Sequence, residues 1–360
     1  MQFELDDERS LLRSSTRELL EGEAALEDTR SLMEDASEGY SKAFFGQLAE
    51  LGYFGLLLSE DEGGADMGAL GLAAVLAEMG RVALPGPFLE SVVASEILRR
   101  AEGDAAAALL ARVVAGDALV VLADREGLGG AAPAPIATRL EAGQLTGVKT
   151  FVPFGEQADA LIVTTADGLA LAQRPDAGWS ASPLPTLDHA QRFAQIELGG
   201  PAELLAVQDG ALDAAGRLGT LGAAALLFGL MERSLEIALA YMMERQAFGS
   251  PLAGFQALQH RAADMLIKVE TTRSAVFRAA WALDQRTEDA PFLVAVAKAW
   301  AGDAGRLVCG ESIQVHGGVG YTWEYDPHVY LKRVKTLEAF FGSTREQLEA
   351  ALHLAPVAAG

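Results

Sequence analysis

The residues best suited to chemistry in this sequence lie in one stretch, YMMERQAFGSPLAGFQALQH, at positions 241–260. Arg245, Phe248 and Gly249 form an R-x-x-F-G pattern near the expected end of a helix, and Gln256 follows shortly after it. A guanidinium at a helix end can bind a diphosphate through two parallel hydrogen bonds, because its N–H groups form a planar fork. The alternative is an arginine that is only solvated at its helix end, and the residue type alone leaves both interpretations open.

A second stretch, IQVHGGVGYTWEYD at positions 313–326, contains Gln314 followed by Gly317 and Gly318. Backbone that carries no side chain can approach a ligand closely, so the glycines indicate a second contact surface. The alternative is a tight turn between two helices. A lone histidine such as His316 is more often structural than catalytic, and we expect a structural role for it.

The elements that must position these residues follow from the apolar pattern. Apolar residues at three- and four-residue spacing predict helices up to about residue 115, and short runs rich in Val, Ile, Leu and Thr then predict an antiparallel β domain. Long helices with short links after residue 209 favour an antiparallel bundle. The predicted domains are an N-terminal helical domain (1–115), a middle β-barrel domain (116–208) and a C-terminal four-helix bundle (209–360), with bundle helices over 209–246, 254–285, 289–317 and 327–354.

Composition restricts the classes of function. The chain has 360 residues, a net charge of −22 and an isoelectric point near 4.6, and a surface this acidic repels nucleic acid and anionic membranes. The single cysteine, Cys309, excludes an intrachain disulfide and favours a reducing, cytoplasmic location. The longest apolar run, 218–231, is too short to span a bilayer and is typical of a core helix. No group of residues has metal-ligand spacing, so we expect no metal.

Taken together, these motifs resemble the acyl-CoA dehydrogenase family. LGYFGLLLSEDEGGADMG is similar to the family's L-G-x-x-G-x-x-x-P-E-x-x-G-G stretch, LTGVKTFV to its G-x-K-x-W-I-T strand, and IQVHGGVGY to its Q-x-x-G-G-x-G-Y turn. The resemblance implies a mainly α fold with a middle β domain, usually assembled as dimers or tetramers. It also implies dehydrogenation of an acyl-CoA thioester by FAD.

The resemblance further implies that FAD is shared at a subunit interface. In the family the flavin ring lies against the β-barrel of one subunit, and the ADP half reaches the helical bundle of its neighbour. The residues that this resemblance assigns to the ADP half are Arg245, Phe248, Gln256, Gln314, Gly317 and Gly318.

The family's catalytic base is a glutamate at one of two positions, and neither position holds a carboxylate here. The turn before the last helix carries Phe341, and the position early in the first bundle helix is Gly219. We therefore assign no catalytic residue. Glu338 lies close in sequence to the first position and is the alternative candidate.

The flavin-ring contacts expected in the β domain also differ from the family pattern. The loop similar to T-E-P-x-x-G-S-D falls near residues 122–135, where Asp124, Gly127 and Gly129 are present but the hydroxyl donors are missing. Phe151 replaces the family's tryptophan. Pro153 replaces its threonine and has no backbone N–H to donate. We expect the neighbouring Lys149 to be a surface or turn residue.

The main hypothesis is a subunit of a heteromeric α2β2 dehydrogenase whose paralogous partner supplies the ring site and the base. TWEYDPHVYLKR at 322–333 resembles the bundle of bacterial enzymes of this kind, some of which act on CoA thioesters of steroid side chains. The resemblance implies an acyl-CoA substrate and an electron-transfer flavoprotein as acceptor. Two alternatives remain open: a self-sufficient homo-oligomer that uses an unassigned base, and a non-enzymatic binding or structural relative.

Overall fold

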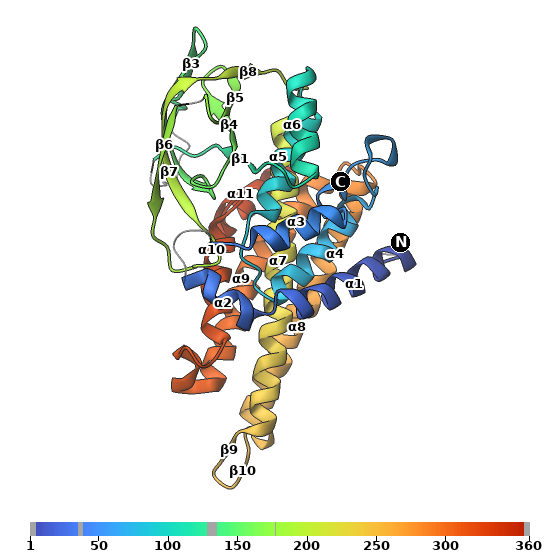
Figure 1. The fold of residues 1–360 in the computed structure, drawn as a ribbon. Helices are drawn as coiled ribbons and strands as arrows, with labels where there is room; N and C mark the ends of the chain where they lie inside the picture. The colour runs from blue at the N-terminus through green and yellow to red at the C-terminus, as the bar shows by residue number, and fades with distance from the viewer. Residues whose placement is uncertain (1–4, 35–38, 128–134, 177, 356–360) are drawn as a thin grey trace. The chain divides into compact units, whose positions relative to one another are not determined.

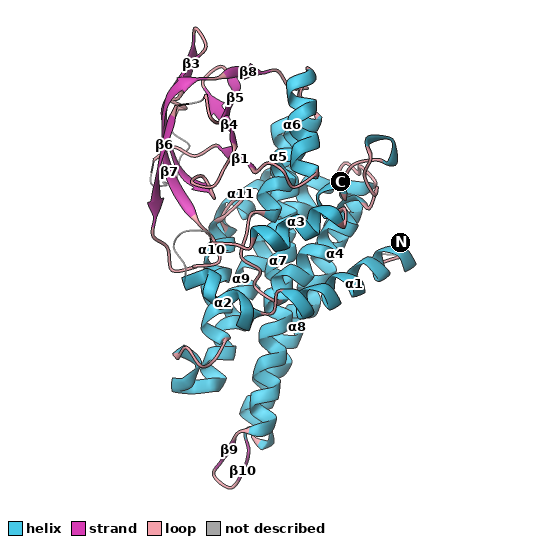
Figure 2. Ribbon diagram, viewed as in Figure 1, coloured by secondary structure: helices cyan, strands magenta, loops and turns pink. Residues whose placement is uncertain are grey.

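The computed structural model describes residues 5–34, 39–127, 135–176 and 178–355, in the predicted order of helices, strands and helices (Figures 1 and 2). The first helices are α1 (Asp7–Glu23), α2 (Leu26–Glu34), α3 (Lys42–Glu50), α4 (Gly68–Arg81), α5 (Phe88–Arg99) and α6 (Asp104–Val114). The strands of the middle region are β1 (Val120–Ala123), β2 (Arg139–Glu141), β3 (Gln144–Pro153), β4 (Ala160–Thr165), β5 (Gly168–Gln173), β6 (Trp179–Leu184), β7 (Phe193–Pro201) and β8 (Glu203–Leu205). The last helices are α7 (Ala211–Glu244), α8 (Gln256–Asp284), α9 (Ala290–His316), α10 (Pro327–Ala339) and α11 (Thr344–Leu354). The mainly helical class with a middle β region is confirmed.

Packing groups the chain into two compact units that alternate along the sequence. The first unit contains Met1–Thr29, Met67–Leu84 and Thr220–Gly360, and the second contains Arg30–Asp66 and Pro85–Gly219. The first unit therefore combines α1 and α4 with the long C-terminal helices. The second combines the remaining N-terminal helices with the strands.

The long helix α7 forms part of the hydrophobic core. Among the described helices it is the one long and apolar enough to cross a membrane, with a mean hydropathy of 1.4 over its most apolar stretch. Because 78% of that stretch is buried inside the protein, α7 is a core helix, as the sequence indicates.

Two glycines allow α4 and α7 to approach each other closely. A Cβ atom added to Gly229 of α7 would lie 1.8 Å from the carbonyl oxygen of Ala77, and one added to Gly80 of α4 would lie 2.3 Å from that of Leu226. Neither distance is compatible with a side chain, so these glycines set the spacing of the two helices.

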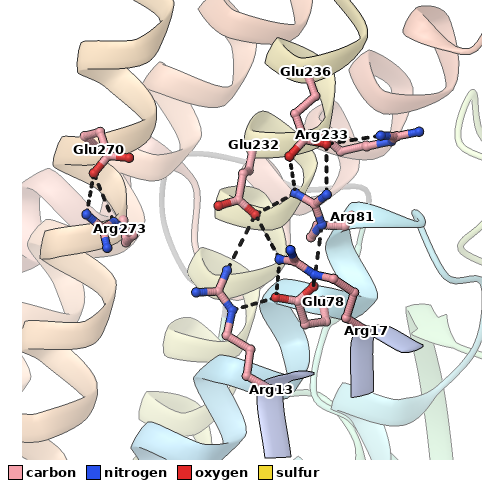
Figure 3. A network of polar contacts seen from close by, with 9 residues as sticks. All are labelled: Arg13, Arg17, Glu78, Arg81, Glu232, Arg233, Glu236, Glu270 and Arg273. Carbon is pink, nitrogen blue, oxygen red and sulfur yellow. Dashed lines mark hydrogen bonds and ion pairs between the residues drawn. The ribbon is translucent and has the colours of Figure 1, made fainter. Parts of the chain in front are cut away.

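A network of charged side chains joins α1, α4 and α7 within the same unit (Figure 3). Glu78 of α4 is 1% exposed and accepts hydrogen bonds from Arg13 Nε at 2.6 Å and Arg17 Nε at 2.8 Å. Arg81 pairs with Glu232 of α7 at 2.7 Å. A buried carboxylate without partners would be strongly destabilising, so α1 is held against the bundle by these ion pairs.

The fourth predicted bundle helix is two helices, because the chain turns sharply between α10 and α11. Phe341 and Gly342 adopt φ values of 55° and 92°, which a helix does not permit. Ser343 then begins α11 in a capping box with Glu346. The fully buried Lys298 of α9 donates from Nζ to the carbonyl oxygens of Glu338 at 3.1 Å and Gly342 at 2.7 Å, which fixes the turn.

The strands form two four-stranded sheets in the second unit (Figure 2). Their orders are β1-β4-β5-β8 and β2-β3-β7-β6. All neighbouring strands are antiparallel except β1 and β4, which pair in parallel, so the expectation of a wholly antiparallel domain is wrong for this pair. Strand β3 has a bulge between Lys149 and Val152, where Phe151 adopts a φ of 52°.

The expectation that Lys149 is a surface or turn residue is also wrong, because it lies buried in β3. Its side chain is 0% exposed, and Nζ donates to Glu126 Oε1 at 2.7 Å and to Thr164 Oγ1 at 3.0 Å. Glu126 also accepts from the backbone N–H and the hydroxyl of Thr138. Burial alone would raise the pKa of Glu126, but the hydrogen bonds from Lys149 and Thr138 outweigh it and lower the pKa to about 2. The loop after β1 is therefore fastened to β2 and β3 by an ionised carboxylate.

We predict that Gly229→Ala destabilises the protein by at least about 2 kcal/mol, because the new methyl group overlaps the Ala77 carbonyl and the helices must separate. Gly216→Ala is the control on the same helix. It has nothing within 4 Å of the added Cβ, and should be neutral or stabilising by about 0.5–1 kcal/mol. Urea unfolding followed by circular dichroism compares the two, and equal effects would refute the close-approach explanation.

We predict that part of the stability is lost in acid through Glu126. Its folded-state pKa of about 2 lies below the ordinary value of 4.5, so its stabilisation is complete above that ordinary value and disappears as the pH falls from about 4.5 to about 2. Between roughly pH 6 and pH 3, the wild type should lose about 1–2 kcal/mol more unfolding free energy than Glu126→Gln, after allowance for the carboxylate's partial exposure. If the unfolding free energies of the two proteins changed with pH in parallel, Glu126 would not be the source of the acid sensitivity.

Candidate functional site

The connection between α7 and α8 carries the first group of predicted site residues. The short strands β9 (Gln246–Ala247) and β10 (Ser250–Pro251) form a hairpin at the end of the α7–α8 pair (Figure 1). Phe248 and Gly249 form its turn with φ values of 53° and 83°, as two-residue hairpin turns require. The Phe248 side chain is 99% exposed, an uncommon position for a large aromatic group on a protein surface.

Arg245 lies immediately after the last residue of α7. Its backbone N–H donates to Tyr241 O at 2.9 Å, and its carbonyl accepts from Leu252 N at 2.9 Å, so the backbone is fixed. The guanidinium is exposed and makes no ion pair within the described parts of the chain. Gln256 begins α8 and is also exposed. The two side chains therefore have their polar groups available to a ligand.

The end of α9 carries the second group. Gln314 lies in its last turn and is exposed, and Gly317 ends the helix with a φ of 65° before the 3-10 helix η4 (Gly317–Tyr321). The turn itself therefore favours a glycine at position 317. This agrees with the alternative interpretation, in which the glycines form a tight turn between two helices. Gly318 is different, because it has no positive φ and nothing lies within 4 Å of an added Cβ. Local packing therefore does not require a glycine at position 318. Because Gly318 has no side chain, its exposed backbone is open to a ligand.

The two groups lie at the same end of the bundle. Helix α8 begins where α7 ends, and α9 returns antiparallel to α8, so the end of α7, the start of α8 and the end of α9 meet there (Figure 1). Arg261 of α8 and Glu311 of α9 form an ion pair of 2.7 Å at this end. The rings of Tyr241 and His316 stack at a centroid distance of 4.1 Å. Sequence reasoning missed this stack, although an aromatic residue one turn before Arg245 was the available signal.

The turn at the first family base position keeps a defined conformation without a carboxylate. The carbonyl oxygen of Phe341 accepts hydrogen bonds from Thr220 Oγ1 at 3.3 Å and from Gln347 Nε2 at 3.0 Å. Thr220 directly follows Gly219, the second base position. The alternative candidate, Glu338, has its carboxylate 3.5 Å from Lys335 Nζ on the same helix, α10.

In the part of β3 that resembles the family's flavin-ring strand, Thr150 has both its donors engaged within the chain. The N–H of Thr150 donates to Arg125 O at 2.9 Å, and the hydroxyl of Thr150 donates to Gly127 O at 2.5 Å. Pro153 is buried and has no N–H. The ring side chain of Phe151 packs edge-on against Phe193. Gly129 of the adjoining loop lies outside the described residues.

The bundle end and β3 differ in how well their polar groups match the two halves of an FAD molecule. At the bundle end, an exposed guanidinium, two exposed amides and open backbone at Gly318 fit the charges and hydrogen-bonding groups of a diphosphate and an adenine. At β3, the N–H and the hydroxyl of Thr150 donate to Arg125 and Gly127, so neither is free to pair with the polar edge of a flavin ring. Among the described residues, those at the bundle end suit the ADP half, whereas Thr150 of β3 has no free donor for the ring half.

Comparison with known proteins identifies the family of this chain. Residues 6–117 match the acyl-CoA dehydrogenase N-terminal domain and residues 215–352 the C-terminal domain. The chain is 32% identical over 345 residues to acyl-CoA dehydrogenase IpdE2 of Mycolicibacterium smegmatis, covering 96% of this chain and 97% of that protein.

Two solved structures have similar chains at 27% identity. The ChsE4–ChsE5 complex of Mycobacterium tuberculosis matches with a TM-score of 0.88 over 99% of this chain and 100% of the other. The Tcur3481–Tcur3483 steroid ACAD variant matches with a TM-score of 0.87 over 97% of both chains. The protein therefore belongs to the acyl-CoA dehydrogenase family, whose members are FAD-binding oxidoreductases.

Proposed function

We propose that this chain is a subunit of a heteromeric acyl-CoA dehydrogenase and that it binds part of the partner's FAD cofactor. In this proposal, a paralogous partner chain holds the flavin ring and supplies the catalytic base, and this chain binds the ADP half of the same FAD. The observation that carries the proposal is the contrast between the two surfaces. Polar side chains at the bundle end are exposed, whereas the donors of Thr150 in β3 are hydrogen-bonded within the chain.

The free groups suit a nucleotide diphosphate. The guanidinium of Arg245 would pair with the phosphate oxygens, and the amides of Gln256 and Gln314 would donate to or accept from the nucleotide. The backbone at Gly318 admits close approach because no Cβ occupies the surface there. When bound, FAD supplies hydride acceptance for oxidation of the acyl chain.

The chemistry requires a carboxylate that removes the α-proton of the thioester. Phe341 and Gly219 cannot accept a proton, and the carboxylate of Glu338 is paired with Lys335 at 3.5 Å. The proposal therefore assigns the base to the partner chain. An adjacent acyl-CoA dehydrogenase gene that encodes the missing glutamate is the partner we expect, and the assembly is a heterotetramer.

Exposed apolar side chains near the candidate site support a protein partner. Met243 is 70% exposed, Phe248 99%, Tyr321 68% and Trp323 54%. Large apolar groups gathered at one end of a bundle usually mark a surface that another protein covers. A partner seated there would bring its own flavin within reach of Arg245.

The substrate class follows from the relatives. One similar structure is a steroid ACAD, and another is a complex of two differently named proteins. We propose a CoA thioester with a bulky, steroid-like acyl group as substrate, with an electron-transfer flavoprotein as electron acceptor. A single FAD site for two unlike chains would leave room for such a group.

The decisive experiment is expression of this chain alone and together with the partner gene. The isolated chain should be colourless, and the co-purified complex should show a flavin spectrum with one FAD for each pair of unlike chains. An isolated chain that is yellow and oxidises an acyl-CoA would reject the proposal in favour of a self-sufficient enzyme. A complex without flavin would favour a non-enzymatic role.

We predict that Arg245→Ala and Gly318→Val each weaken FAD binding by the complex at least tenfold, because the first removes charge-assisted hydrogen bonds and the second fills the open backbone surface. Flavin fluorescence titration measures the affinity. Arg306→Ala is the matched control, since Arg306 is an exposed arginine of α9 in an ion pair with Asp303. Both variants should retain the wild-type melting temperature, and unchanged FAD affinity in both would contradict the assigned surface.

A further inference from the structure

Three aromatic rings connect the chain segments that border the candidate nucleotide surface. Tyr241 lies in the last turns of α7, His316 is the last residue of α9, and Tyr325 lies in the link before α10. Tyr241 and His316 are stacked with an interplanar angle of 24°. Tyr325 meets both edge-on, at 6.1 Å from Tyr241 and 5.9 Å from His316. We call these three residues the aromatic clamp.

The clamp has a fixed orientation because His316 is held in place. Its ring Nδ1 lies 2.7 Å from the carbonyl oxygen of Ser312, and since a carbonyl only accepts, Nδ1 carries the proton and donates. His316 is only 5% exposed, and burial lowers its pKa, so the imidazole is neutral at neutral pH. A neutral ring with one fixed donor presents a constant face to Tyr241.

Each ring of the stack is directly connected to one of the two predicted motifs. The carbonyl of Tyr241 accepts the N–H of Arg245 at 2.9 Å, so the position of Arg245 follows that of Tyr241. His316 directly precedes Gly317 and Gly318, and its Cβ lies 3.0 Å from the place a Cβ of Gly320 would take. The stack thus joins the start of the R-x-x-F-G loop to the start of the glycine turn.

We infer that the aromatic clamp sets the distance between Arg245 and the glycine turn, so that one dinucleotide can contact both. Tyr241, His316 and Tyr325 are positioning residues that do not touch the cofactor themselves. This inference rests on the proposed function, because it names the device that keeps the ADP surface assembled. Ion pairing of Arg261 with Glu311 supports the same end of the bundle but does not fix the ends of α7 and α9 to each other.

The test uses the complex of this chain with its partner, with FAD removed and then titrated back. Tyr241→Leu removes the ring at similar bulk and should weaken FAD binding at least tenfold. Tyr241→Phe keeps the ring and should bind FAD within twofold of the wild type. Tyr325→Leu removes only the edge contacts from a partly exposed position, and should give an intermediate loss without disturbing the helices.

A double-mutant cycle distinguishes positioning from general destabilisation. If Tyr241 acts through Arg245, Tyr241→Leu should have little further effect on FAD affinity in an Arg245→Ala background. Equal losses in both backgrounds, equal damage by Phe and Leu at position 241, or normal FAD binding by both Tyr241→Leu and Tyr325→Leu would each overturn the clamp. If Arg245→Ala itself binds FAD normally, the proposed function fails and not only the clamp.

Discussion

A buried hydrogen-bond donor can satisfy few acceptors at once, and this constraint decides what each surface of the protein can bind. In the β region, the N–H and hydroxyl of Thr150 and the ammonium group of Lys149 serve acceptors of the same chain. Breaking those bonds to admit a ligand would leave buried groups unpaired, which costs about 1–3 kcal/mol for each group. At the bundle end, Arg245 and Gln256 remain exposed. The division of roles that we propose for the two surfaces rests on this difference.

The exposed polar groups at the bundle end belong to helices that are held in place by contacts in the interior of the unit. Gly80 and Gly229 bring α4 and α7 into backbone contact. Arg13 and Arg17 of α1 pair with Glu78 of α4 and with Glu232 of α7, which holds α1 against both helices. With the core of α7 held in this way, its last turns can extend to the β9–β10 hairpin (Figure 1). A rigid helix places Arg245 more reproducibly than a loop of the same length would, since only the final residues are free to move.

Much of the fold could be predicted from the sequence, because helix period and strand composition are local signals. The bundle helices α7, α8 and α9 begin and end within a few residues of the predicted limits. The burial of Lys149 could not be predicted, since its partner Glu126 lies 23 residues earlier and only the fold brings them together. The stack of Tyr241 on His316 depends in the same way on two helices that meet far apart in sequence. The R-x-x-F-G and glycine motifs were found because each is contiguous, whereas their mutual placement is a tertiary property. Their binding role stays a prediction.

The turn between α10 and α11 has one further consequence. Lys298, Thr220 and Gln347 donate hydrogen bonds to the main-chain carbonyl oxygens of residues 338, 341 and 342 in this turn. Main-chain oxygens are present whatever side chain a codon specifies, so these four hydrogen bonds do not depend on the side chain at position 341. If a related chain carries a carboxylate at this position, as the proposed function expects, the same hydrogen bonds can support the turn in both chains. A turn supported in this way permits two related chains to differ in the side chain at this position while their backbones follow the same path.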